Sequence, residues 1–148
     1  MGWAVRIIVS IIILSNTMEM SLMKHIINTD NAPAPIGPYN QAVKSGHLLY
    51  TSGQIPMDPL TGQMVSGGIR EQTIQVLENL KNILEEEECT LDDVIKTTVF
   101  LADMADFPKL NTIYAEYFGE DNAPARSTVQ VAALPKGALV EIEAIAKI

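Results

Sequence analysis

The chain has 148 residues, which is enough for one domain with a substantial core and too few for two ordinary domains. Its 47% hydrophobic and 19% charged residues are typical of a globular protein rather than a disordered segment or a disulfide scaffold. The net charge of −8 argues against a nucleic-acid-binding protein. The single cysteine, Cys89, cannot form an internal disulfide, and a reducing compartment fits best.

The first 22 residues form an extension ahead of domain-like sequence. An apolar run from Ile7 to Leu14 follows Arg6 and looks like the start of a signal peptide, but no small-residue cleavage site follows. The run is also shorter than the roughly 20 residues that span a bilayer. We therefore expect an N-terminal extension over 1–22, a single domain over 23–148 and a cytoplasmic protein without a membrane anchor. The alternative reading is an N-terminal targeting peptide.

The first part of the domain is predicted to contain three extended segments. The stretch "KHIINT" predicts a short strand, and the loop "DNAPAPIGPY" that follows contains too many Pro and Gly residues to be helical. Segments near 41–45 and 47–54 are joined by Gly46 with the spacing of a hairpin. The domain therefore begins with three strands.

Two helices are predicted in the middle of the chain. From Ile69 to about Glu87 apolar residues recur every three or four positions, as on one face of a helix, and the acidic end is expected to fray. A strand follows in "VIKTTVFLA", which is rich in β-branched residues. The second helix has Asp106 as a candidate cap, Pro108 in its first turn and Gly119 as its stop.

Two strands complete the chain, from Ser127 to Leu134 and through "VEIEAIAKI". The order βββ-α-β-α-ββ predicts an α+β fold in which both helices cover one face of a single sheet. In the last strand Val140, Ile142, Ala144, Ala146 and Ile148 alternate to one side, which is expected to face the helices.

The opposite face of the sheet is predicted to be mixed in character. Glu141 and Glu143 point there, and the alternation of Val129 and Val131 places Arg126, Thr128 and Gln130 on the same side. A face that is neither dry nor evenly charged indicates packing against other subunits around wet pockets.

Arg126 and Glu141 are the candidates for chemistry at this face. The planar fork of an arginine suits bidentate capture of a carboxylate, but an ion pair between Arg126 and Glu141 or Glu143 explains the pattern equally well. A carboxylate near an arginine that does not neutralise it can hold and activate water. Simple strand alternation is the competing explanation for Glu141.

Other polar residues give weaker signals. Ser52 lies beside Gly53 at a strand end, Asn111 lies opposite the apolar stripe of its helix, and Tyr39 follows a Gly-Pro turn. Each has an ordinary structural explanation as a cap, a surface amide or a core-edge ring. The two histidines have no metal-ligand spacing, and no glycine-rich phosphate motif is present. We expect neither a metal nor a cofactor.

A more specific pattern is the succession of four stretches along the chain: "NAPAPIGPYNQAV", "LLYTSGQIPMDPLTG", "IKTTVFLADMADFPKLNTIYAEYF" and "PARSTVQVAALPKGALVEIEAIA". From about Lys24 to Ile148 the chain resembles the RidA/YjgF family of reactive-intermediate (enamine/imine) deaminases. The resemblance implies a chorismate mutase-like fold, with a six-stranded mixed sheet backed by two helices. It also implies a homotrimer with ligand clefts between subunits.

The reaction implied by the resemblance is hydrolysis of 2-imino acids, such as 2-iminopropanoate and 2-iminobutanoate, to 2-oxo acids and ammonia without a cofactor. Arg126 would bind the substrate carboxylate and Glu141 would position the attacking water. Tyr39, Ser52 and Asn111 would line the cleft, with Tyr39 reaching into a neighbouring subunit's site.

Thr128 departs from the family pattern, since many deaminating members have cysteine at this position. Its backbone would still contact the ligand, and the exchange bears on substrate preference and rate. The alternative function is a non-catalytic trimer that binds small carboxylates or regulates a partner. A ribonuclease role, also attached to this family, fits poorly with the acidic charge.

Overall fold

The computed structural model describes residues 6–10 and 23–148, and its elements follow the predicted order. The strands and helices are β1 (His25–Ile27), β2 (Ala42–Ser45), β3 (Leu48–Thr51), α2 (Ile69–Glu85), β4 (Val94–Leu101), α3 (Phe107–Phe118), β5 (Ala125–Gln130) and β6 (Val140–Lys147). Short 3₁₀ turns precede β4, α3 and β6. The prediction of three strands, a helix, a strand, a helix and two strands is confirmed.

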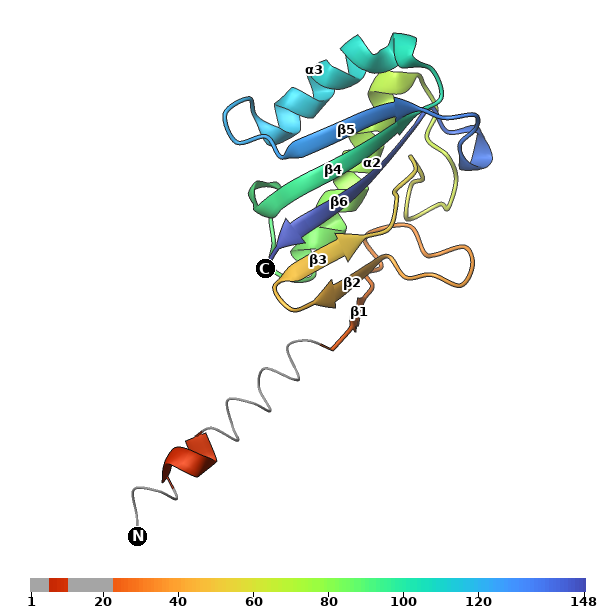
Figure 1. Ribbon diagram of the computed structural model, residues 1–148. Helices are drawn as coiled ribbons and strands as arrows, with labels where there is room; N and C mark the ends of the chain where they lie inside the picture. The colour runs from red at the N-terminus through yellow and green to blue at the C-terminus, as the bar shows by residue number, and fades with distance from the viewer. Residues whose placement is uncertain (1–5, 11–22) are drawn as a thin grey trace.

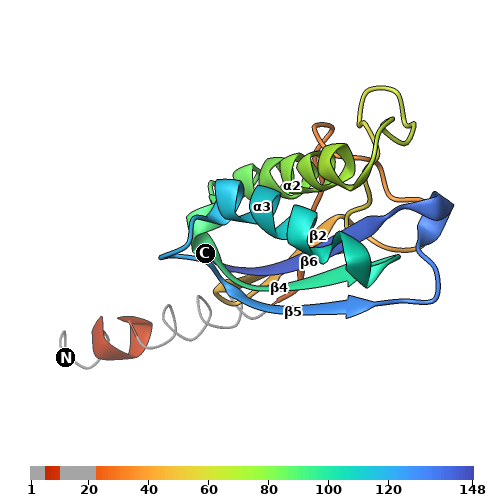
Figure 2. The same cartoon turned by 90° about the horizontal axis from the view of Figure 1, so that it is seen from above.

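The strands form one six-stranded sheet in the order β1-β2-β3-β6-β4-β5. Neighbours pair antiparallel except β4 and β5, which are parallel and joined by α3. Both helices lie on the same side of the sheet, and no described helix covers the other side (Figures 1 and 2). The predicted α+β fold with a mixed sheet backed by two helices is confirmed.

The core lies between this sheet and the two helices. Val76, Leu77, Leu80 and Ile83 of α2 are completely buried, as the three- and four-residue spacing predicted. They face the alternate residues of β6 from Val140 to Ala146, none of which is more than 3% exposed. Each fully buried aliphatic side chain of this kind contributes about 1.5–3 kcal/mol, so this layer fixes the position of β6.

Several element boundaries differ from those predicted. Asp106 does not cap α3 through its side chain; Asp103 instead accepts a hydrogen bond from the Ala105 amide at 2.8 Å and caps the turn that leads into the helix. Pro108 does lie in the first turn of α3, and Gly119 ends the helix with a φ of 70°. The strand predicted from Ser127 to Leu134 ends at Gln130.

Residues 6–10 form one helical turn whose Ile7 and Ile8 side chains are more than half exposed. The rest of the predicted extension, 1–5 and 11–22, lies outside the described residues. Within the described part of the chain, no helix is both long enough and apolar enough to cross a membrane. The extension over 1–22 and the cytoplasmic location remain predictions.

The uncovered face of the sheet carries a row of apolar side chains. Strand register aligns Ile26, Val43, Tyr50 and Ile145 across β1, β2, β3 and β6. Ile26 and Tyr50 are 54% and 40% exposed. Glu141 shares this face, because it alternates with the buried residues of β6.

Candidate active site

Arg126 lies on the helix-covered face of the sheet, and the prediction that it shares a face with Glu141 is wrong. It pairs in register with Thr97 of β4, which is completely buried and hydrogen-bonds Tyr114 of α3 at 2.7 Å. Directly paired residues of neighbouring strands point to the same side. The ion pair considered between Arg126 and Glu141 or Glu143 is therefore excluded within one chain.

The Arg126 guanidinium is oriented by aromatic rings. Its central carbon lies 4.6 Å from the centroid of the Tyr114 ring and 5.3 Å from that of Phe107. Among the described residues no carboxylate forms an ion pair with it. Cation–π contacts hold the planar group but leave its N–H donors available.

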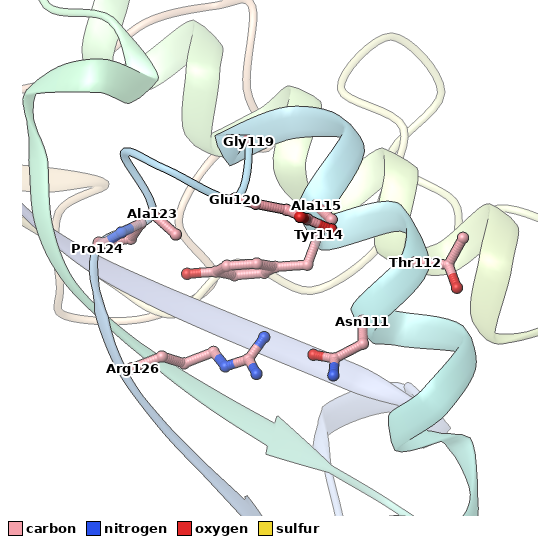
Figure 3. A pocket seen from close by; sticks show the side chains of 9 residues that line it. All are labelled: Asn111, Thr112, Tyr114, Ala115, Gly119, Glu120, Ala123, Pro124 and Arg126. Atoms are coloured by element: carbon pink, nitrogen blue, oxygen red, sulfur yellow. The ribbon is translucent and has the colours of Figure 1, made fainter.

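A cavity of about 580 Å³ opens beside Arg126, and we call it the arginine pocket. Its walls come from the last turns of α3 and the loop that leads into β5, and they include Asn111, Tyr114 and Pro124. The Asn111 amide and the Arg126 guanidinium point into the same space (Figure 3). An amide beside a guanidinium fork provides both donors and an acceptor for a small anionic ligand.

Thr128 lies two residues beyond Arg126 on the same face of β5, opposite the buried Val99. Its hydroxyl oxygen is buried and has no hydrogen-bond partner. A buried hydroxyl without a partner costs about 1–3 kcal/mol, which a ligand or a water molecule at this position would recover.

Glu141 lines a second cavity, of about 730 Å³, which we call the glutamate pocket. Tyr39, Ser52, Gly53, Lys136 and Glu143 are also in its wall. Burial, and then the negative charge of Glu143, raise the pKa of the Glu141 carboxyl above its ordinary value. Such a carboxyl is a better proton acceptor, once ionised, than an exposed glutamate.

Tyr39 and Ser52 are held in the glutamate pocket by local hydrogen bonds. The Tyr39 hydroxyl accepts from the Ile36 amide at 3.1 Å, although the side chain is 48% exposed. The Ser52 hydroxyl donates to the Asn40 carbonyl at 2.5 Å, so towards a ligand it can only accept. Both residues therefore present fixed oxygens to the cavity.

The six predicted site residues thus fall into two groups. Arg126, Asn111 and Thr128 lie on the helix-covered side at β5, whereas Tyr39, Ser52 and Glu141 lie around the glutamate pocket. Arg126 and Glu141, which were predicted to share a face, are therefore separated within one chain, because the two side chains leave opposite faces of the sheet.

Sequence reasoning missed two contributors to these pockets. Tyr114 lies among the apolar residues of the second predicted helix and gave no separate signal of a site role, but its ring orients Arg126. Its place about one turn after Asn111 was the available signal. Lys136 stands at the rim of the glutamate pocket in a left-handed conformation with a φ of 55°. No feature of the sequence indicated that conformation.

Over residues 6–10 and 23–148, no three His, Cys, Asp or Glu side chains come together in a way that could hold a metal ion. The oxygens and nitrogens described above are instead suited to a small organic anion and a water molecule.

Comparison with known proteins places these pockets in context. The family model described as endoribonuclease L-PSP matches residues 29–148. A RutC family protein of Pyrococcus horikoshii is 60% identical over 124 residues, which is 84% of this chain and 98% of the relative. The human protein named 2-iminobutanoate/2-iminopropanoate deaminase is 52% identical over 126 residues, 85% of this chain and 91% of its own.

A solved structure extends the similarity to three dimensions. The structure of TdcF from E. coli with bound serine matches with a TM-score of 0.79 and 45% sequence identity. The match covers 84% of this chain and 98% of that chain. Similarity in sequence and similarity in fold therefore cover nearly the same share of the chain, 84–85%.

Proposed function

Because the chain belongs to the endoribonuclease L-PSP (RidA/YjgF) family, we propose that it hydrolyses 2-imino acids such as 2-iminopropanoate and 2-iminobutanoate to 2-oxo acids and ammonia. Named deaminases that are 52% identical over most of the chain support this reaction. The observation that carries the proposal is a pair of complementary pockets, one with a free guanidinium and one with a half-buried carboxylate.

The two pockets are halves of one site formed between copies of the chain. The arginine pocket of one copy faces the glutamate pocket of the next, so that the guanidinium and the carboxylate approach the same ligand. The apolar row of Ile26, Val43, Tyr50 and Ile145 supports such an assembly, because a partly exposed apolar sheet face is stabilised by burial against another copy. In a homotrimer, three copies form a ring in which each arginine pocket meets a glutamate pocket of the next copy.

Each half of the site has a separate task in the reaction. Arg126 and Asn111 bind the carboxylate of the imino acid, and the guanidinium fork sets its orientation. The serine bound to TdcF shows that a similar protein accepts a small amino acid. The imine carbon of the bound substrate then lies towards the carboxylate from the neighbouring copy.

Ionised Glu141 accepts a proton from a water molecule as its oxygen attacks the imine carbon. The electron pair of the C=N bond moves to the nitrogen of the protonated imine, and a neutral carbinolamine forms. Glu141 then gives its proton to the amino group. As the C–N bond breaks, Glu141 takes the hydroxyl proton, the 2-oxo acid forms, and ammonia leaves and carries this proton away as ammonium. An imine carbon is already electrophilic, so orientation and one base suffice without a cofactor.

The experiment that tests this function supplies 2-iminobutanoate as it is released by a pyridoxal-phosphate dehydratase. We expect the purified protein to accelerate the appearance of ammonia and 2-oxobutanoate above spontaneous hydrolysis. Binding of 2-oxobutanoate without any such acceleration would instead establish the alternative, a non-catalytic carboxylate-binding protein. Cleavage of single-stranded RNA, the activity in the family's name, is not expected from a chain of net charge −8.

A further inference from the structure

Gly53 occupies a constrained position between β3 and the start of the next loop. The amide of Ser52 donates to the Gln41 carbonyl at 2.8 Å. On the other side Gln54 exchanges two backbone hydrogen bonds with Ile142 of β6, at 2.9 and 3.1 Å. The backbone on both sides of Gly53 is therefore fixed to neighbouring strands, and one of these attachments is adjacent to Glu141.

The side chain of Glu141 fills the space where a side chain at position 53 would begin. A Cβ atom added to Gly53 would lie 2.8 Å from Cδ and 3.0 Å from Cγ of Glu141, and it would overlap Oε1. Carbon atoms in ordinary contact are about 3.5–4.0 Å apart. Since the backbone of Gly53 is not in the left-handed region, space rather than conformation requires glycine here.

We propose that Gly53 is a positioning residue for Glu141, because its missing side chain lets the carboxylate lie against the fixed backbone of 52–54. This inference rests on the proposed function, in which Glu141 accepts the proton of water. With glycine at position 53, one wall of the glutamate pocket holds the carboxylate at a defined depth. With any larger residue, the carboxylate must rotate away, since neither neighbouring peptide can move without breaking its hydrogen bonds.

Gly53→Ala tests the catalytic consequence. We expect kcat to fall by about 10- to 100-fold, because a displacement of about 1 Å is enough for such a loss. The dissociation constant for 2-oxobutanoate should change less than about 3-fold, since Arg126 binds the carboxylate. Adding Glu141→Asp, whose shorter side chain relieves the overlap, should cost far less in this variant than in the parent protein. The proposal would be overturned if kcat were unchanged in Gly53→Ala, or if the loss in the double variant equalled the product of the losses in the two single variants.

A second cycle tests the contact without any assay of activity. In the parent protein Gly53→Ala should lower Tm, whereas in a Glu141→Ala background it should leave Tm unchanged or raise it, because alanine restricts the unfolded chain. This difference in Tm between the two backgrounds is expected even if the parent protein shows no deaminase activity, so failure of the proposed function and failure of this inference are distinguishable. If Gly53→Ala alone does not fold, the Tm of the double variant with Glu141→Ala still tests whether the contact with Glu141 is the cause.

The carboxyl group of Glu141 provides a direct readout by NMR titration of carbon-13-labelled protein. Moving the carboxylate out of its half-buried position should lower its pKa towards the ordinary value in Gly53→Ala. The control is Gly68→Ala, where the added Cβ meets only Glu71 at 3.9 Å. The control should leave kcat and the Glu141 titration unchanged. An identical Glu141 titration in Gly53→Ala and the parent would contradict the inference.

Discussion

The Arg126 side chain is held by contacts that require a guanidinium. Its planar group lies over Tyr114 and Phe107, and a lysine ammonium offers neither the flat surface nor two parallel donors. We predict that Arg126→Lys lowers kcat/KM for 2-iminobutanoate by about 100-fold, since charge-assisted bidentate bonds are lost. Binding of 2-oxobutanoate, measured by calorimetry, should weaken in parallel.

The control for this change is Lys109→Arg, which exchanges the same two residue types on an exposed position of α3. It should leave turnover and binding unchanged. Turnover at the parent rate in Arg126→Lys would remove Arg126 from the site. Loss of assembly in that variant would mean that its defect is structural, so native mass spectrometry should accompany the kinetics.

The raised pKa of Glu141 predicts the acid limb of the pH profile. Only the ionised carboxylate can accept a proton from water, so kcat should fall as the pH drops through a pKa that lies above the ordinary glutamate value. Glu143→Gln removes the neighbouring negative charge, which is the second cause of the shift after burial. In this variant the acid limb of the rate profile should therefore move to lower pH.

Glu85→Gln is the matched control for Glu143→Gln, because it removes an equal charge from the exposed end of α2, where Glu85 contacts Lys81. The acid limb should stay in place in this control. An equal displacement in both variants would attribute the effect to net charge rather than to the neighbour of Glu141. Movement of the limb to higher pH in Glu143→Gln would contradict the assignment of Glu141 as the base.

At the scale of elements, the sequence was most informative where one face of an element is completely buried. α2 and β6 follow their apolar periodicity because every residue on the inner face packs in the core. β5 does not, and its two faces are the reverse of those predicted. It is an edge strand whose Val129 remains 44% exposed on the uncovered face.

The physical reason for the reversal in β5 is the register with β4. Parallel pairing of Thr97 with Arg126 and of Val99 with Thr128 fixes the direction of both side chains. The aliphatic part of an arginine side chain can pack against aromatic rings, as a valine side chain does. Hydrophobicity alone therefore does not determine which face of β5 points towards the helices. The parallel register depends on α3 and cannot be read from β5 by itself.

The loop before β2 is the other element that sequence patterns left open, and Gln41 organises it. Its buried side chain accepts from the Thr29 amide and donates to the carbonyls of Thr29, Ala32 and Pro33 at 2.9–3.0 Å. We predict that Gln41→Leu lowers the free energy of unfolding by about 2–4 kcal/mol, because these backbone groups lose their partners. Urea denaturation at fixed protein concentration measures this change.

Gln63→Leu makes the same substitution at an exposed turn residue and should change the free energy of unfolding by less than about 0.5 kcal/mol. Because the loop also carries Tyr39 into the glutamate pocket, Gln41→Leu should raise KM. A Gln41 variant as stable as the Gln63 control would show that the loop holds its shape without this side chain.

At the scale of the whole molecule, the composition of the site depends on topology rather than on any local pattern. The sequence predicted Arg126 and Glu141 as site residues, but only the pairing register of β5 and β6 with β4 shows that their side chains leave opposite faces of the sheet. The intersubunit cleft implied by the family resemblance is consistent with this separation. In the function proposed above, one chain supplies one half of each of two sites, and the sequence alone does not indicate which halves.

This arrangement predicts complementation between inactive variants. Arg126→Lys retains an intact glutamate pocket, and Glu141→Gln retains an intact arginine pocket, so each homotrimer lacks one half of every site. Unfolding and refolding the two together in equal amounts gives mixed trimers. If each site takes Arg126 from one copy and Glu141 from another, about a quarter of the sites are complete, and we expect about a quarter of the parent activity. If both residues came from the same copy, no mixed trimer would contain a complete site, and the mixture would be as inactive as its components. Each variant refolded alone is the control. Native mass spectrometry near three times 16.2 kDa verifies exchange when it resolves mixed trimers, whose masses lie between those of the two pure variant trimers.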